Sequence, residues 1–215
     1  MLVLVGRNDI GKSTLLEALD IFFNEGRGCV KLDKDDINKD CLARDEDTIE
    51  IEVEFSELPP KLVLDTTNET TLEAEYLLTS AGTLRVLKRY QNAGKEKVFV
   101  RASHPSNSGC ADLLLKKNAE LKKIVDDGGF ECTDKTKNAE LRKAIWASQG
   151  ELDLKDTEIE VAKIDAKGIW DQLKGHMPLY TLFQSDRKNS DSDDEVQDPM
   201  RIAVREILGD PKIKA

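Results

Sequence analysis

A short apolar run leads into a glycine-rich loop, and the loop leads into a helical pattern. Residues 6–13 read Gly-Arg-Asn-Asp-Ile-Gly-Lys-Ser and satisfy the pattern G-x-x-x-x-G-K-[ST]. The apolar run Leu2–Val5 predicts a strand before the loop, and Leu15, Leu16 and Leu19 predict a helix after it. This order of strand, loop and helix predicts an α/β domain with a phosphate-binding loop.

The residue types of the loop match the chemistry of a bound triphosphate. Gly6 and Gly11 let the backbone turn tightly, so that successive N–H groups face a phosphate. The helix that begins at Lys12 adds the positive end of its dipole. The ammonium group of Lys12 can reach the β- and γ-phosphate oxygens, and the hydroxyl of Ser13 can bind Mg²⁺. The sequence therefore predicts a nucleoside triphosphate and Mg²⁺ as cofactors.

Length, charge and cysteine usage limit the remaining choices. The 215 residues suffice for one large domain, or for one domain with a small insertion. A formal net charge of −10 argues against a surface that is basic overall, although it leaves room for a local basic patch. No apolar run is long enough to span a membrane, and the four cysteines are widely spaced. We therefore expect reduced thiols and a cytoplasmic protein.

The middle of the chain alternates between apolar and polar residues. Ile49–Phe55 has the period of a half-buried strand whose outer side chains are glutamates. Three further strands are expected at Leu72–Thr79, Thr83–Tyr90 and Lys97–Ala102, because short connections with Gly or Asn separate them. This pattern predicts an antiparallel β-lobe.

A helical region follows, with helices expected at Leu113–Val125, Ala139–Ala147 and Ala166–Lys174. The five-residue sequence Lys-Asn-Ala-Glu-Leu occurs twice, at residues 117–121 and 137–141. The first two of these helices, joined by Asp126–Thr136, resemble the helix–extended loop–helix of small DNA-binding modules such as SAP domains. The alternative is that the repeat reflects ordinary helix composition. The basic residues that could contact DNA there are Lys122, Lys123, Arg142 and Lys143.

The last part of the chain combines an apolar strand, an acidic stretch and a helix. The strand is expected at Leu179–Phe183, directly before Gln184. The acidic stretch Lys188–Asp198 is interpreted as a solvated loop, and the helix is expected at Met200–Leu208.

The phosphate-binding loop and the helix after it resemble the ATPase heads of the ABC superfamily that act on DNA. These include the SMC, RecF and OLD (overcoming lysogenization defect) groups, whose loops typically read G-x-N-x-x-G-K-[ST]. Residues 8–12 are most similar to OLD-family proteins, which are ATP-dependent endonucleases in defence against phage. The stretch Pro178–Pro199 also looks like this family. The resemblance implies a P-loop NTPase fold of the ABC-head type, with a mixed sheet, an antiparallel β-lobe and a helical insertion.

The resemblance also implies roles for individual residues. Thr14 would lie near the α-phosphate, and Asn8 near the γ-phosphate or a partner subunit. Gln184 resembles the Q-loop glutamine that senses Mg²⁺ and the attacking water, although it is equally an ordinary strand-end residue. Catalytic roles fall to Lys12 and Gln184, and metal binding to Ser13 and Gln184. The residues expected to bind ATP are Gly6, Arg7, Asn8, Asp9, Ile10, Gly11, Lys12, Ser13 and Thr14.

The sequence departs from this family in parts that a working ATPase needs. Lys61–Asp65 is a β-like run that ends in Asp, but Thr66 follows where a catalytic Glu belongs, so we interpret it as structural. No Ser-Gly-Gly signature and no TOPRIM carboxylate cluster is recognisable. We therefore expect an incomplete head, with residues 1–102 forming its loop and β-lobe, 103–176 a helical insertion, and 177–215 the Q-loop-like strand and the start of a helical arm.

The function expected from this resemblance is an ATPase head whose ATP-driven dimerisation gates a nuclease outside the chain. Its expected partners are ATP, a second head, DNA in the full assembly and a partner subunit of a defence system. A membrane is not among the expected partners. Two alternatives stay open. One is a DNA-repair or chromosome-maintenance ATPase of the RecF or SMC type that has no nuclease. The other is a nucleotide-sensing interaction module that does not hydrolyse ATP.

Overall fold

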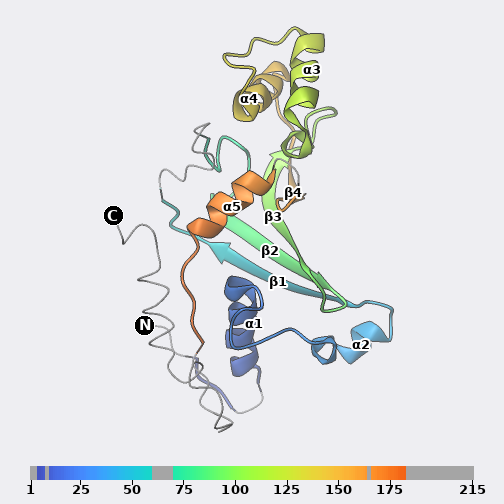
Figure 1. The fold of residues 1–215 in the computed structure, drawn as a ribbon, viewed down its shortest axis with the longest axis vertical. Coiled ribbons are helices and arrows are strands. Elements are labelled where there is room, and N and C mark those ends of the chain that lie inside the picture. Colours follow the sequence, from blue (N-terminus) through green and yellow to red (C-terminus); the bar gives the residue numbers. More distant parts are fainter. Residues whose placement is uncertain (1–3, 8–9, 60–69, 164–165, 183–215) are drawn as a thin grey trace. The chain divides into compact units, whose positions relative to one another are not determined.

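The computed structural model describes residues 4–7, 10–59, 70–163 and 166–182, and it divides into two compact units (Figure 1). The smaller unit comprises residues 1–32 and 178–215, and the larger unit comprises residues 33–177. The β-like run at 61–65, the acidic loop at 188–198 and the helix expected at 200–208 fall outside the described residues. The boundaries 1–102, 103–176 and 177–215 remain a prediction.

The larger unit is built on a four-stranded antiparallel sheet in the order β1-β2-β3-β4 (Figure 1). Its strands are β1 (Thr48–Phe55), β2 (Leu84–Gln91), β3 (Glu96–Pro105) and β4 (Leu154–Glu160). The first three confirm strands expected from period-two alternation. Every pairing among the described strands is antiparallel, so the expected mixed sheet is not found in this part of the chain.

One face of the sheet forms a core with helix α5 (Ala166–Gly175). The register places Val53, Val86, Val100 and Ile159 in one row across the four strands. The buried side chains of α5 follow helical spacing and are Ala166, Ile169, Trp170 and Leu173. The ring of Trp170 lies 5.6 Å from Nζ of the buried Lys88 on β2, so α5 packs against this face.

The opposite face carries a lattice of ion pairs, which explains the glutamates that alternate along β1. Arg89 pairs with Glu50 at 2.5 Å and with Glu158 at 2.9 Å. Arg101 pairs with Glu52 at 2.7 Å and with Glu158 at 2.8 Å. Because these side chains are partly exposed, each pair contributes little stability by itself. The lattice instead fixes the register by pairing opposite charges across neighbouring strands.

The strand expected at Leu72–Thr79 is wrong, because this segment forms successive turns. Its alternation of apolar and polar residues resembles that of a strand, but Tyr76 has a left-handed φ of 53°. The N–H of Leu77 donates to the carbonyl of Leu72 at 2.9 Å, closing the turn. Glu75 points inward and is 1% exposed. Glu75 therefore contributes to a strand-like alternation although its side chain is buried, and the sequence alone does not distinguish this turn segment from a strand.

The fourth strand of the sheet, β4, was not expected. It reads Leu-Lys-Asp-Thr-Glu-Ile-Glu and buries only Ile159. An edge strand with so little apolar content gives a weak periodic signal. Its position within residues 103–176 shows that this region is not helical throughout.

The helical region contains two similar helices, α3 (Asn118–Gly128) and α4 (Asn138–Ser148). The helices expected at Ala139–Ala147 and Ala166–Lys174 are confirmed as α4 and α5. The single helix expected from Leu113 to Val125 is wrong, because a 3₁₀ turn (Leu113–Leu115) and an extended Lys116 precede α3. The repeated sequence begins both helices, and the Asn118 side-chain amide donates to Asn138 Oδ1 at 2.6 Å.

A shared apolar core joins α3 and α4. Leu121 and Leu141 occupy equivalent positions of the two repeats and are both fully buried. The remaining buried members of this core are Cys110, Leu113, Val125, Ile145 and Trp146. The repeat is therefore accounted for by packing between the two helices.

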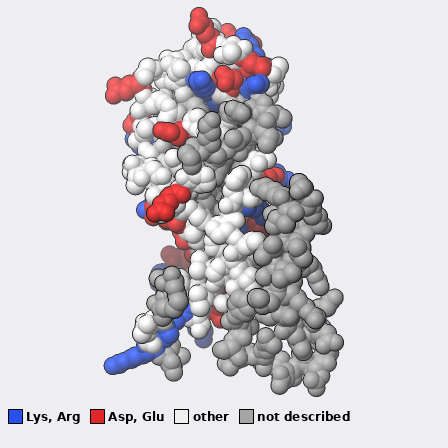
Figure 2. Space-filling view, turned by 90° about the vertical axis from the view of Figure 1, so that its left-hand side faces the viewer, with Lys and Arg blue, Asp and Glu red and all other residues white. Residues whose placement is uncertain are grey.

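The expected DNA contact at Arg142 is not supported by its position. Arg142 on α4 is buried and donates two hydrogen bonds to the buried Glu75, from Nε at 2.7 Å and from Nη2 at 2.6 Å. Figure 2 shows acidic and basic side chains interspersed over the upper part of the molecule, which contains α3 and α4. On that face, no continuous basic patch marks a nucleic-acid surface among the described residues.

The remaining described elements are short. A 3₁₀ turn (Lys34–Asp36) and the one-turn helix α2 (Lys39–Leu42) lie between Val30 and Glu46, a segment whose pattern predicts no element. Among the described residues, we find no helix with the length and apolar character needed to cross a membrane.

The first prediction concerns the buried ion pair between Glu75 and Arg142. Glu75→Gln should lower the free energy of unfolding by about 3–5 kcal/mol, because it leaves a buried guanidinium uncompensated. Glu73→Gln is the matched control: it lies two residues away, it is exposed, and it should change stability by less than about 0.5 kcal/mol. Urea denaturation measures both values, and equal effects of the two variants would contradict the account.

The second prediction concerns His104, which is buried on β3 beside Tyr76 and Trp146. Its Nδ1 lies 3.0 Å from the carbonyl oxygen of Tyr76, and its Nε2 has no partner in the described part of the chain. Burial lowers the pKa of His104 and outweighs the opposing effects of the Tyr76 carbonyl and Glu75. The neutral imidazole is thus the form that the fold favours.

Because the unfolded chain binds this proton more readily, stability should be lost as the pH falls below about 6.5, the usual pKa of histidine. The loss due to His104 cannot exceed about 1.4 kcal/mol per pH unit. In His104→Gln, urea denaturation between pH 5 and pH 7.5 should show a smaller pH dependence than in the wild type. His176→Gln is the exposed control. The assignment would be refuted if His104→Gln kept the pH dependence of the wild type, or if His176→Gln lost it.

Candidate functional site

The phosphate-binding loop ends where helix α1 (Lys12–Asn24) begins. The start of α1 at Lys12 confirms the helix expected directly after the loop. Leu4 and Val5 do not belong to a strand, which contradicts this part of the strand expected at Leu2–Val5; Leu2 and Val3 lie outside the described residues. Val5 is 87% exposed, so it lacks the apolar burial that a central strand requires.

Two glycines shape the described part of the loop. Gly11 precedes α1 with φ 85° and ψ 15°, a left-handed conformation that glycine adopts without steric cost. A Cβ atom placed on Gly6 would lie 2.1 Å from Cδ1 of Ile10, so the loop closes over the space that a side chain would fill. The left-handed φ of Gly11 and the lack of room for a side chain at Gly6 both suit a tightly turning phosphate-binding loop.

Lys12 folds back onto the loop that precedes it. Its Nζ donates to the carbonyl oxygen of Gly6 at 2.8 Å and also to the carbonyl oxygen of Arg7. The ammonium group thus lies beside the backbone between the two glycines. The structure brings together Gly6, Arg7, Gly11 and Lys12 from the expected set.

The first turn of α1 supplies donors that suit an anion. The first hydrogen bond of the helix runs from the N–H of Leu15 to the carbonyl of Gly11 at 3.0 Å. The N–H groups of Lys12, Ser13 and Thr14 therefore have no partner within the helix. No side chain caps this end, and its first turn contains no acidic residue. These donors and the exposed Ser13 hydroxyl fit a phosphate and Mg²⁺.

A buried carboxylate anchors the other end of α1. Asp20 accepts hydrogen bonds from the N–H of Val30 at 2.9 Å and from the side-chain amide of Asn24 at 2.8 Å. A Cβ on Gly28 would lie 2.2 Å from Oδ2 of Asp20, so the chain passes directly over this carboxylate. Asp20 lies on the helix among apolar residues, and the sequence offered no signal that it is a buried anchor.

The segment Pro178–Leu182 lies against α1 without forming a strand, so the strand expected at Leu179–Phe183 is wrong for the described residues. The hydroxyl of Tyr180 donates to the carbonyl of Leu16 at 2.9 Å, and its ring stacks on Phe23. The carbonyl of Tyr180 accepts a hydrogen bond from Asn24 at 3.1 Å. Side-chain contacts with one helix thus hold this extended segment, which explains why strand-like composition misled the prediction.

The pKa values of the Cys29 thiol and the Tyr180 phenol are both raised. Burial, with the charge of Asp20 as a second cause, raises the pKa of Cys29. The same two causes raise the pKa of Tyr180. Both groups therefore stay neutral at physiological pH, so Tyr180 keeps the proton that it donates to Leu16.

Several large apolar side chains of the smaller unit are exposed. Ile10 is 60% exposed and Leu15 is 51% exposed. The other members of this group in the smaller unit are Leu4, Val5, Leu16 and Leu179. We call these six residues the exposed apolar group.

The remaining expected site residues fall outside the described residues. They are Asn8 and Asp9 of the loop and Gln184, the expected Q-loop glutamine. In the described ranges, no group of three or more His, Cys, Asp or Glu side chains is placed to hold a metal ion.

The third prediction tests the left-handed turn at Gly11. Gly11→Ala should weaken the binding of Mg²⁺-ATP about fivefold or more, because a Cβ at this φ costs about 1 kcal/mol and shifts the N–H groups of the loop. Gly150→Ala is the matched control, because Gly150 has a similar φ of 72° and also has no atom near its Cβ position. Titration calorimetry measures both affinities. Similar losses of affinity in the two variants would show that Gly11 has no special role.

A comparison with protein families supports the assignment of this loop. The family model AAA_15, described as an AAA ATPase domain, matches residues 1–214. No curated protein and no solved structure gave a match. The match includes the loop, α1 and the whole of the larger unit. The chain therefore belongs to the AAA ATPase domain family.

Proposed function

We propose that this chain is the ATP-binding head of an OLD-like, DNA-processing ATPase that acts in defence against phage. The observation that carries the nucleotide assignment is the arrangement of Gly6, Gly11 and Lys12 around the start of α1. The family match over residues 1–214 supports an ATPase domain. The similarity of residues 8–12 to the OLD family supports the finer assignment.

In this proposal each group of the loop has a defined role. The N–H groups of the first turn of α1 bind phosphate oxygens, together with the helix dipole. Lys12 exchanges its hydrogen bonds to the loop carbonyls for ones to the β- and γ-phosphates, and Ser13 binds Mg²⁺. Mg²⁺, when bound, neutralises charge on the phosphates. Thr14 lies at the same helix end and contacts the α-phosphate.

Hydrolysis requires more than a phosphate cradle. A water molecule must be positioned in line with the γ-phosphate, and the charge of the transition state must be stabilised. We assign the catalytic carboxylate and the signature segment to a part outside this chain, and the Mg²⁺-sensing role to Gln184. The chain alone should therefore bind ATP and hydrolyse it slowly.

We further propose that ATP brings two heads together and that this association gates DNA cleavage by a nuclease outside the chain. The exposed apolar group supports an interaction surface on the smaller unit, because large apolar side chains in water favour association. Loss of the γ-phosphate would then release the heads.

The fourth prediction tests nucleotide binding and association together. Lys12→Ala should weaken Mg²⁺-ATP binding at least about tenfold, because it removes charge-assisted hydrogen bonds to the phosphates. Lys31→Ala is the control for charge, since Lys31 is an exposed lysine of the smaller unit. Titration calorimetry gives affinity, phosphate release gives turnover, and light scattering gives the mass in the same samples.

Wild type and Lys31→Ala should bind ATP equally well and release phosphate slowly. Rapid turnover by the chain alone would show that the catalytic carboxylate lies within it. In the complete assembly, a dimer that forms equally well without nucleotide would contradict ATP-driven gating. Equal ATP affinity of wild type and Lys12→Ala would contradict the assignment of the loop itself.

A further inference from the structure

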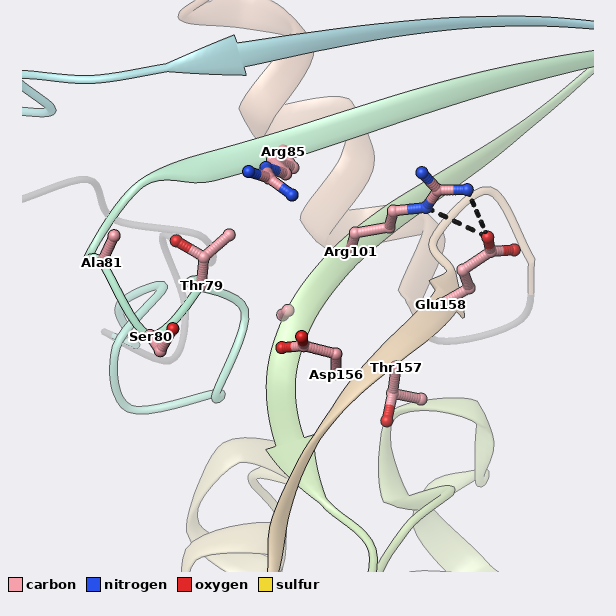
Figure 3. A pocket seen from close by; sticks show the side chains of 9 residues that line it. Thr79, Ser80, Ala81, Arg85, Arg101, Asp156, Thr157 and Glu158 are labelled. Atoms are coloured by element: carbon pink, nitrogen blue, oxygen red, sulfur yellow. Dashed lines mark hydrogen bonds and ion pairs between the residues drawn. The ribbon is translucent and has the colours of Figure 1, made fainter.

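The larger unit contains a pocket of about 380 Å³, whose lining includes no residue of the phosphate-binding loop (Figure 3). It is lined by the turn at residues 79–81 and by parts of β2, β3 and β4. This volume lies in the range of small-molecule sites. Figure 3 shows Arg85 and Asp156 on different sides of the pocket, with the turn at residues 79–81 beside both.

Arg101 and Glu158, which both line the pocket, form an ion pair with each other. Arg101 donates to Oε1 of Glu158 from Nε at 3.0 Å and from Nη2 at 2.8 Å. Burial alone would raise the pKa of Glu158, but the hydrogen bonds from Arg101 and Arg89 lower it overall. Glu158 is therefore ionised and matched by two arginines. This pair forms a wall of the pocket and leaves little charge for a ligand.

The charge of Arg85 has fewer opposite charges near it than the charge of Arg101 has. It lies directly opposite Arg101 in the β2–β3 register, and like charges in opposite positions repel. Among the described residues, its one ion pair joins Nε to Oε2 of Glu54 at 3.3 Å, and Nε is buried there without a hydrogen bond. Within the described residues, no partner is found for the two outer nitrogens of its guanidinium group. An anion in the pocket would supply the missing acceptors.

The position of Arg85 is fixed through Glu54. The hydroxyl of Thr83 donates to Oε1 of Glu54 at 2.6 Å, and Thr83 in turn lies 2.7 Å from the hydroxyl of Thr79. The hydrogen bond from Thr83 is the main cause that lowers the pKa of Glu54, and Arg85 adds to it. Glu54 thus stays ionised and holds Nε, which leaves the outer nitrogens for a ligand.

Asp156 supplies the opposite charge. Its carboxylate makes no hydrogen bond or ion pair with any residue that the structure describes, although it lines the same pocket as Arg85. Arg85 keeps two outer nitrogens without an acceptor among the described residues, and it forms no ion pair with Asp156 across the pocket. A ligand that carries an anion and a cation would pair with both.

We propose that this pocket binds a small zwitterionic molecule, with its phosphate or carboxylate on Arg85 and its ammonium group on Asp156. The hydroxyl of Ser80 is a further donor at the pocket wall. The site uses no residue of the phosphate-binding loop, so this proposal goes beyond the nucleotide function. Because the pocket is open to solvent, its ion pairs are screened and binding should be weak and sensitive to salt.

The test uses O-phosphoethanolamine as the zwitterionic probe, with inorganic phosphate and ethanolamine as probes that each carry one of its two charges. Titration of the isotope-labelled chain at low salt, followed by NMR of backbone amides, assigns each response to a site. The zwitterion should saturate shifts at residues 79–81 and 156–158 at least about threefold more tightly than either single-charge probe. Any response of phosphate at residues 6–14 is separate and belongs to the nucleotide site.

Two variants and two controls complete the test. Arg85→Gln and Asp156→Asn should each weaken the zwitterion at residues 79–81 at least about threefold, whereas the exposed control substitutions Lys97→Gln and Glu151→Gln should not. Thermal melting confirms that each variant is folded. Shifts that do not saturate, shifts confined to residues 6–14, or equal affinity for phosphate alone would overturn the proposal. Loss of nucleotide binding in Lys12→Ala with the pocket response retained would show that the two sites are independent.

Discussion

The left-handed turn at Gly11 is the constraint on which the nucleotide site depends. It ends the loop and begins α1 at Lys12, so the N–H groups of the first helical turn point away from the helix body. A residue with a Cβ would resist this conformation and would displace Lys12 from the loop. The buried carboxylate of Asp20 then holds the chain that follows α1, through the N–H of Val30. A left-handed glycine turn and a buried anchor thus fix the two ends of one helix.

The larger unit owes its specificity to polar groups as much as to its apolar core. One face of the sheet packs against α5 and the other carries the arginine–glutamate lattice. The buried pair of Glu75 and Arg142 joins the turn segment near residue 75 to α4. Such a pair adds little net stability over an apolar pair, but removing one partner leaves a buried charge that is costly. Arg85, which has one ion pair among the described residues, and Asp156, which has none there, differ from these fully paired groups.

The sequence predicted the parts of the fold that local pattern controls. The alternation at Ile49–Phe55 and the helical spacing of Ala166–Lys174 correspond to β1 and α5. The glycines of the loop and the start of α1 follow directly from the motif. The segment at Leu72–Thr79 was assigned wrongly because Glu75 alternates with apolar neighbours yet points into the core toward Arg142. Strand β4 was missed because an edge strand with one buried residue carries almost no periodic signal.

Long-range contacts determine what local pattern cannot. Asp20, Tyr180 and Arg142 each take their role from a partner distant in the sequence. The residue type of Arg142 suggested a DNA contact, whereas its burial shows a structural role. The pocket also depends on contacts between distant parts of the sequence. Its charged residues Arg85 and Asp156 lie on β2 and β4, and the order of the strands brings both to the pocket.

The most direct test of the account is amide hydrogen exchange of the chain with and without Mg²⁺-ATP. The account predicts slower exchange at residues 6–14, because their N–H groups would bind phosphate oxygens. It predicts no change along β2 and β3, which contribute nothing to the loop. Unchanged exchange at residues 6–14 under saturating Mg²⁺-ATP would contradict the central claim that this loop binds the nucleotide.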